Sequence, residues 1–253
     1  MKLQDQVSIV TGAGSGMGRA ASVLFAKEGS KVVLADIDAV RGQETARFVE
    51  DLGGDALFVK TDVSKTADVK NLVKQAVAKY GKVTVLYNNV GYMDEYDDTV
   101  TEMPEEVWDR IMAVNLRGMY LVAKYTIPEM AKTGGGKIVN IASVGGLIAM
   151  DSTGYAVSKA GVISLTKCIA QQYAKQHIRC NVICPGPVDT PFNINTQKKK
   201  ARSPGTGFTG TTPLLERRAK PEEIAKMGLF LASDDSSYAT GATFIVDGGR
   251  MAR

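Results

Sequence analysis

Tyr155 and Lys159 stand four residues apart, and Ser143 lies twelve positions before the tyrosine. If residues 152–175 are helical, positions i and i+4 share one face, so the Lys159 ammonium lies beside the Tyr155 phenol. A free tyrosine has a pKa of about 10, and a nearby positive charge lowers it. The three side chains could transfer a proton at a carbinol or carbonyl oxygen, with Ser143 holding that oxygen. For such a pair alone, a solvated helix face is the alternative.

A glycine-rich turn follows the first predicted strand. Residues 7–11 form a short apolar run, and an apolar helical pattern begins after the turn. Strand, turn and helix together make a cradle for a diphosphate, because glycines let the backbone approach the phosphates and the helix N-terminus carries a positive dipole. The spacing departs from the usual G-x-G-x-x-G pattern. The residues expected to contact the diphosphate are Gly12, Ser15, Gly16, Met17 and Gly18.

The second predicted strand ends in Asp36, eighteen residues after Gly18. A carboxylate at this position can accept hydrogen bonds from the hydroxyls of an adenosine ribose and would repel a 2′-phosphate. The neighbouring Ser15 and Ile37 supply no cation that would bind such a phosphate. Asp36 could instead be a helix N-cap.

With these motifs and several others, the chain resembles the short-chain dehydrogenase/reductase family over nearly its whole length. The family's Asn-Asn-Ala-Gly turn after the fourth strand is Asn-Asn-Val-Gly here, with Val90 as the departure, and its two extra methyl groups predict a local adjustment of the turn. The matching positions are Thr11, Gly12, Gly16 and Gly18 for the cofactor motif, Asp62 and Val63 for the adenine contact, Asn115, Ser143, Tyr155 and Lys159 for catalysis, and Pro185 with Gly186 after the sixth strand.

The resemblance implies an NAD(H)-dependent oxidoreductase that interconverts a secondary alcohol and a ketone. Tyr155 would be the general acid and base, and Lys159 would lower its pKa and hold the nicotinamide ribose. Ser143 would orient the substrate oxygen, and Asn115 would anchor a water in a proton relay. Besides the glycine turn, Asp36, Tyr155 and Lys159, the implied cofactor contacts are Ile37, Asp62, Val63, Asn89, Val90, Gly91, Pro185, Gly186, Val188 and Thr190.

The substrate pocket follows from family geometry. We expect it to accept a medium-sized ketone, a cyclic alcohol or a sugar, with Asp151 either facing it or capping the next helix. Residues 189–215 form a long irregular segment, interpreted as a substrate lid with Phe192, Ile194 and Phe208 as apolar contacts; the alternative is a solvated loop. Lys198–Lys200 with Arg202 could attract an anion or form a solvated face. The expected lining is Tyr92, Met93, Ser143, Gly145, Met150 and Phe192.

Two other functions compete with this one. The C-terminal Ala-Thr-Gly-Ala-Thr-Phe-Ile-Val-Asp-Gly-Gly segment also resembles 3-oxoacyl carrier-protein reductases, but these usually prefer NADP, which Asp36 argues against. A cofactor-binding sensor without turnover would keep the fold, yet it would not need the intact catalytic set.

Composition narrows the class of protein. The chain has 253 residues, 44% of them hydrophobic, and a net charge of +4. There is no basic stripe with interleaved aromatics, so no nucleic-acid partner is expected. The chain has no run of eighteen apolar residues and no signal peptide is expected, so we predict a cytoplasmic protein that spans no membrane. Three cysteines are interpreted as free thiols, mostly buried, and no metal site is predicted.

Apolar runs and helical patterns alternate along the chain. This alternation predicts a single α/β domain over residues 1–253, a Rossmann-type doubly wound parallel sheet of about seven strands with helices on both faces. The candidate site residues follow strands, where such sheets bind ligands. By resemblance we expect a homo-oligomer, with a tetramer favoured. Two long helices offer apolar positions that could form the interface or could equally be buried in the core: Ile111, Met119, Val122, Ile163 and Ile169. Strands are predicted at 6–11, 31–36, 56–61, 83–88, 136–142, 178–184 and 243–247, and helices at 16–28, 39–52, 66–80, 104–132, 152–175 and 221–233.

Overall fold

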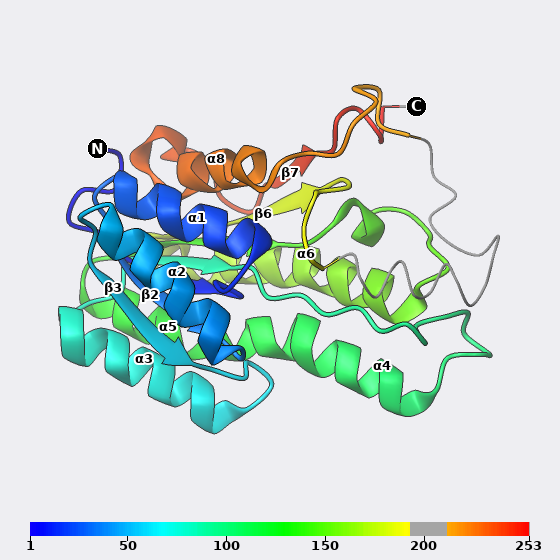
Figure 1. Ribbon diagram of the computed structural model, residues 1–253, viewed down its shortest axis with the longest axis horizontal. Coiled ribbons are helices and arrows are strands. Elements are labelled where there is room, and N and C mark those ends of the chain that lie inside the picture. Colours follow the sequence, from blue (N-terminus) through cyan, green and yellow to red (C-terminus); the bar gives the residue numbers. More distant parts are fainter. Residues whose placement is uncertain (193–211, 253) are drawn as a thin grey trace.

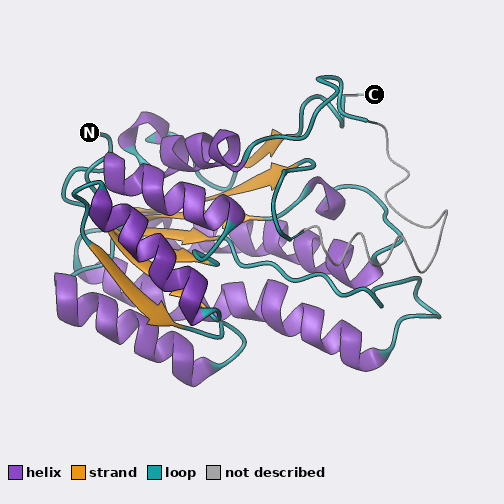
Figure 2. Cartoon of the chain, viewed as in Figure 1, coloured by secondary structure: helices purple, strands orange, loops and turns teal. Residues whose placement is uncertain are grey.

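The computed structural model of the chain describes residues 1–192 and 212–252. Seven strands form one sheet in the order β3-β2-β1-β4-β5-β6-β7, and every neighbouring pair is parallel (Figure 2). The central strands are buried along their whole length, as expected where helices cover both faces of a parallel sheet. The strands are β1 (Val7–Thr11), β2 (Lys31–Asp36), β3 (Ala56–Lys60), β4 (Val85–Asn88), β5 (Gly136–Ile141), β6 (Ile178–Pro185) and β7 (Thr243–Val246).

The helices form a layer on each face of the sheet (Figure 1). α1, α2 and α8 pack on one face around a core that contains Phe25 and Tyr87. α3, α5 and α6 pack on the other face around Leu72 and Val122. The predicted doubly wound fold is therefore confirmed. The helices are α1 (Gly16–Lys27), α2 (Ala39–Asp51), α3 (Thr66–Tyr80), α4 (Glu105–Met112), α5 (Met119–Lys132), α6 (Thr153–Tyr173) and α8 (Pro221–Ala232).

The predicted helix at 104–132 differs from the structure in one respect. It begins as α4, passes through a π-helical segment at Ala113–Gly118, and continues as α5. A π turn holds an extra residue, and an apolar pattern sampled over a long helix does not reveal so short a change of period. The segment contains Asn115, which is fully buried. π-helical turns are frequent at functional sites.

The five apolar positions that could form either an interface or the core are buried within the chain itself. Ile111, Met119 and Val122 are almost inaccessible, and Ile163 and Ile169 are also buried. These side chains belong to the core of one subunit, so they cannot also form an interface. The alternative of core burial is therefore confirmed, because α5 and α6 pack directly on the sheet and α4, which carries Ile111, packs on α6.

The carboxyl ends of the strands lie together at one end of the sheet, on the right in Figure 1. β1 pairs with β2 on one side and β4 on the other, so the direction of winding reverses between β1 and β4. Ligands of open α/β sheets bind at such a reversal. Among the described residues, no helix is long and apolar enough to cross a membrane. Of the predicted lid, Ile194, Lys198–Lys200, Arg202 and Phe208 lie outside the described residues.

Candidate active site

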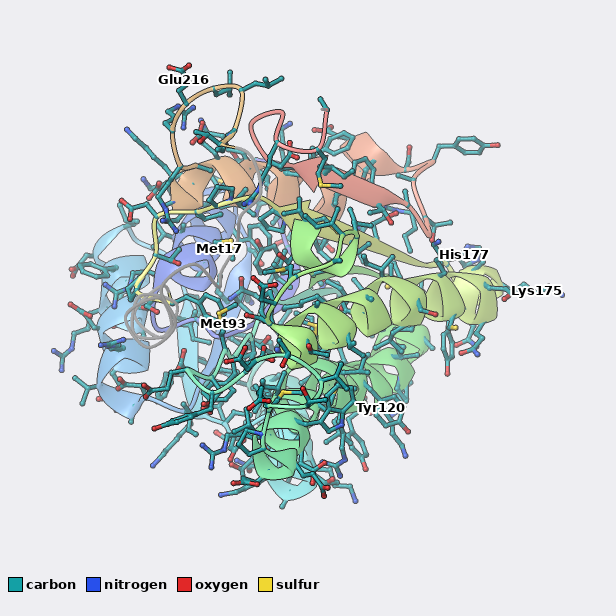
Figure 3. All side chains as sticks on the ribbon, turned by 90° about the vertical axis from the view of Figure 1, so that its right-hand side faces the viewer. Met17, Met93, Tyr120, Lys175, His177 and Glu216 are labelled. Carbon is teal, nitrogen blue, oxygen red and sulfur yellow. The ribbon has the colours of Figure 1, made fainter. Side chains whose placement is uncertain are left out.

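A cavity of about 660 Å³ opens at the carboxyl ends of the strands. In the end-on view of Figure 3, Met17 and Met93 lie near the centre of this face, and both line the cavity. Most of the predicted site residues are brought together here. Those that line it are Gly12, Ser15, Gly16, Met17, Asp36, Ile37, Asp62, Val63, Asn89, Val90, Gly91, Tyr92, Met93, Ser143, Met150, Tyr155, Lys159, Pro185, Gly186, Val188, Thr190 and Phe192.

Three predicted site residues lie behind the cavity wall. A Cβ on Gly18 would stand 2.0 Å from the carbonyl oxygen of Gly12, so this glycine permits close packing of helix and turn. Gly145, expected in the substrate pocket, lies beneath Met150, whose sulfur fills the space where a Cβ would be. Asn115 is fully buried and hydrogen-bonds to the backbone of Tyr92, which lines the cavity.

The glycine turn after β1 is tied to the turn after β4. The Thr11 hydroxyl accepts hydrogen bonds from the backbone N–H groups of Asn89 (2.9 Å) and Val90 (3.2 Å). Gly16 has a φ of +51°, and a Cβ there would lie 3.0 Å from Thr190. The α1 N-cap makes no side-chain cap bond, so this positive helix end can serve an anion in the cavity.

Asp36 is held at the rim of the cavity by two backbone groups. Its carboxylate accepts from the N–H of Gly14 at 2.8 Å and from the N–H of Asp38 at 2.9 Å. The N-cap of α2 is Asp38, which accepts from Val40 and Arg41. Capping therefore does not explain Asp36. With the glycine cradle, a carboxylate fixed at the end of β2 fits a dinucleotide that presents its ribose hydroxyls there.

Tyr155 and Lys159 lie on the buried face of α6, as the helical spacing predicts. The Lys159 Nζ lies 5.7 Å from the centroid of the Tyr155 ring and donates to the Ile141 carbonyl oxygen at 2.9 Å. Ser143 lies beside the Tyr155 side chain, where it lowers the pKa of the phenol, and its Oγ accepts from the Gly145 N–H at 3.0 Å. The three side chains can therefore meet one oxygen atom of a substrate.

Burial dominates the protonation of this pair. It raises the pKa of Tyr155 to about 12, with Cys184 and Asp97 acting in the same direction and the Ser143 hydrogen bond opposing them. Burial lowers the pKa of Lys159 to about 8. The lowered pKa expected for Tyr155 is not found in the protein alone, because taking the phenol out of water favours its neutral form.

Asn115 holds one wall of the cavity in place. Its Oδ1 accepts from the Tyr92 N–H at 2.6 Å, and its Nδ2 donates to the Tyr92 carbonyl at 2.8 Å and to Ser158 Oγ at 3.1 Å. The side chain thus joins the segment after β4 to α6. The water relay implied for Asn115 stays a prediction.

The sequence analysis missed three charged residues in or beside the site, Asp97, Arg218 and Arg250, of which the two arginines line the cavity. Asp97 is fully buried and accepts from the backbone N–H groups of Gly154 and Tyr155. It takes the capping role considered for Asp151, since α6 starts after Ser152, whose side chain makes no cap bond. The run of acidic residues at 94–98 was the available signal. Arg250 is buried and lines the cavity, after a stretch whose pattern indicates only a strand and a turn.

The cysteines follow the prediction of free thiols. All three are unpaired, Cys180 and Cys184 are buried, and Cys168 is exposed. Over residues 1–192 and 212–252 there is no group of three or more residues that could hold a metal ion.

Comparison with known proteins places this site in a family. A family model described as Enoyl-(Acyl carrier protein) reductase matches residues 12–250. A 3-oxoacyl-[acyl-carrier-protein] reductase of Thermotoga maritima is 39% identical over 98% of this chain and 99% of its own. A cyclohexanol dehydrogenase of Acinetobacter sp. is 36% identical over 98% of this chain and 95% of its own.

Solved structures agree with the sequence comparison. A levodione reductase structure superposes with a TM-score of 0.89 at 30% identity, covering 99% of both chains. The chain belongs to the short-chain dehydrogenase/reductase family. It is an oxidoreductase of the kind that acts on CH–OH groups with a nicotinamide cofactor, either NAD or NADP.

The buried ammonium of Lys159 leads to a prediction about stability. Its pKa is about 8 in the folded protein and 10.5 ordinarily. Between these values the unfolded chain binds more protons, so this group's destabilising effect is complete below pH 8 and fades as the pH rises. We expect Lys159→Met to unfold at higher denaturant concentration than wild type at pH 7, with a gain of roughly 3 kcal/mol at most.

Urea unfolding of both proteins at steps from pH 7 to pH 10 measures the gain. It should shrink steadily above pH 8. A gain that stays constant over this range would contradict the assignment of the cost to the Lys159 charge.

Proposed function

We propose that this protein is an NAD(H)-dependent dehydrogenase that interconverts a secondary ring alcohol and the corresponding ketone. The observation that carries the proposal is the cluster of the buried Tyr155 and Lys159 with the half-buried Ser143, which lies in the same cavity as the glycine turn after β1. A group able to exchange a proton with an alcohol oxygen therefore stands next to a site built for a dinucleotide.

Tyr155 and Ser143 have separate roles in the proposed reaction. A bound nicotinamide cofactor supplies hydride transfer. Tyr155 donates its proton to the carbonyl oxygen in reduction and accepts it from the alcohol in oxidation, while Ser143 orients that oxygen and stabilises its partial charge. Its pKa of about 12 keeps Tyr155 protonated in the resting protein, ready for reduction. Oxidation needs a lower pKa, which additional positive charge in the cavity would provide.

The preference for NAD rests on Asp36. Its carboxylate stands at the end of β2, where a 2′-phosphate would meet a negative charge. Two arginines lie near this rim, but Arg19 pairs with Glu44 and Arg41 pairs with Asp38. To bind a 2′-phosphate, either arginine would have to leave its carboxylate partner. This argues against the competing role of an NADP-dependent 3-oxoacyl carrier-protein reductase, which similarity to the Thermotoga enzyme would otherwise favour.

The choice of a ring alcohol rests on the lining of the cavity and on one relative. Met93, Met150 and Phe192 supply apolar surface near Tyr155, and the Phe192 ring centroid lies 6.0 Å from that of Tyr155. The cyclohexanol dehydrogenase has the same family pattern over nearly its whole length. We retain a homo-oligomer and a cytoplasmic location as part of the proposal, and free thiols fit a reducing compartment.

The first test is turnover on a panel of substrates. We expect NAD-dependent oxidation of cyclic secondary alcohols, followed by the absorbance of the reduced nicotinamide. Tyr155→Phe removes only the hydroxyl and should lower kcat at least about a hundredfold, the lower range for general acid–base catalysis. NADH should still bind to this variant. Tight NADH binding by the wild type without turnover on any alcohol or ketone would favour the sensor instead.

A second test concerns the cofactor. Asp36→Ala should shift the ratio of kcat/KM for NAD and NADP by about tenfold or more toward NADP. The substitution removes the repulsion between the carboxylate and a 2′-phosphate, and about 1.4 kcal/mol of repulsion corresponds to a tenfold change. Asp36→Asn is the matched variant, since it keeps the size of the side chain and loses the charge. An unchanged ratio in both variants would refute the role of Asp36 in discrimination.

Arg250 could bind a carboxylate group on the ring of the substrate, and this can be tested. Its guanidinium lines the cavity while buried, and burial lowers its pKa, opposed by Asp247. A buried guanidinium favours a planar anion as its partner. We expect Arg250→Leu to raise KM for a hydroxycyclohexanecarboxylate about tenfold and to leave KM for cyclohexanol nearly unchanged. Equal effects on both substrates would mean that Arg250 only supports the fold.

A further inference from the structure

Asp97 reaches the start of the catalytic helix from a distant part of the chain. It lies between β4 and α4, and its side chain is fully buried. One carboxylate oxygen accepts from the N–H of Gly154 at 2.8 Å, and the other accepts from the N–H of Tyr155 at 2.9 Å. Both donors belong to the first turn of α6, where backbone N–H groups have no helical acceptor. A residue 58 positions away thus caps this helix at the catalytic tyrosine.

The surroundings leave room for this carboxylate and little else. A Cβ on Gly154 would stand 3.1 Å from Ile111, 3.3 Å from an Asp97 oxygen and 3.3 Å from the Met103 sulfur. The glycine therefore admits Asp97 to the helix end. The neighbouring Asp98 differs, because its carboxylate accepts from the N–H of Thr99 in its own loop at 2.9 Å.

The segment after β4 and α6 are joined a second time, one turn further along α6. Asn115 holds the backbone of Tyr92 and donates to Ser158. The segment after β4, which forms one wall of the cavity, is thereby fastened to α6 on both sides of the Tyr155 side chain. Moving the wall would move the helix end that carries the phenol.

Asp97 also acts on Tyr155 through its charge. The groups that face the phenol are Asp97 from the segment after β4, Ser143 from the loop after β5, Lys159 from α6 itself and Cys184 from β6. Asp97 raises the pKa of the Tyr155 phenol, in the same direction as burial.

We propose that Asp97 is a positioning residue, which holds the start of α6 and thereby sets where the Tyr155 hydroxyl stands in the cavity. This rests on the proposed function of Tyr155 as proton donor and acceptor. A neutral cap at the same place would keep the helix and lose the electrostatic effect. A substitution that removes the charge of Asp97 and keeps its shape therefore distinguishes a positioning role from a merely structural one.

The test compares Asp97→Asn with Asp98→Asn, adjacent substitutions that remove the same charge. For oxidation of the alcohol found with the panel, we expect the acid limb of kcat/KM against pH to shift to lower pH in Asp97→Asn. The reason is that removing the negative charge favours the phenolate. We expect kcat to fall about tenfold or more, because a displaced phenol reacts poorly. Asp98→Asn should match the wild type in both respects.

Hydrogen exchange gives a readout that does not need turnover. The amides of Gly154 and Tyr155 should exchange slowly in the wild type and faster in Asp97→Asn, while NADH affinity stays the same. Asp97→Ser, a second neutral cap, serves if the asparagine variant does not fold. Fast exchange of these amides in the wild type would already contradict the proposal.

The outcomes separate the two proposals. An unshifted pH profile in Asp97→Asn, with only stability lost, would reduce Asp97 to a structural cap and overturn the inference. If the wild type turned over no substrate, the proposed function would fail, and the exchange measurement would still decide whether Asp97 holds the start of α6.

Discussion

The rest of the site depends on the burial of an ammonium group at the carboxyl end of β5. Lys159 is almost inaccessible to solvent, and its hydrogen bond to the Ile141 carbonyl anchors it to the last residue of the strand. Burying a charge destabilises the fold unless something compensates for the lost water. Stability given up at a functional site in this way is common in enzymes. Here the loss is the condition for placing a cation beside the Tyr155 phenol, away from competing water.

The buried pair needs rigid supports, and these come from two loops and the π-helical segment, not from its own helix. Ser143 meets the phenol from the loop after β5, and Asp97 and Asn115 act from the segment after β4 and from the π-helical turn. Asp97 and Asn115 are fully buried, Ser143 is half-buried, and each has hydrogen-bond partners. A polar network of this kind specifies a unique geometry when it is satisfied. The π turn is one way in which the chain brings Asn115 into register with both partners.

The cofactor end of the cavity is also held by hydrogen bonds, here between side-chain oxygens and backbone N–H groups. The Thr11 hydroxyl joins the turns after β1 and β4, and the Gly14 N–H holds Asp36 at the rim. Glycines matter here for lack of a side chain, as the 2.0 Å approach of a Gly18 Cβ to a carbonyl oxygen makes plain. The sheet gathers these parts because all its strands point the same way, so every loop that carries a functional residue emerges at one end.

The amino-acid sequence by itself determined the order of strands and helices, the doubly wound class, and the glycine turn with Asp36 and the Ser143, Tyr155 and Lys159 set, because these depend on periodicity and on short spacings. Only the tertiary structure decided what depends on contacts between distant segments. It placed Asp97 at the start of α6, decided that the apolar positions of α4, α5 and α6 belong to the core, and moved Gly18 and Gly145 behind the cavity wall. It also reversed the expected pKa of Tyr155, since desolvation comes from everything packed around a residue and no local spacing encodes it.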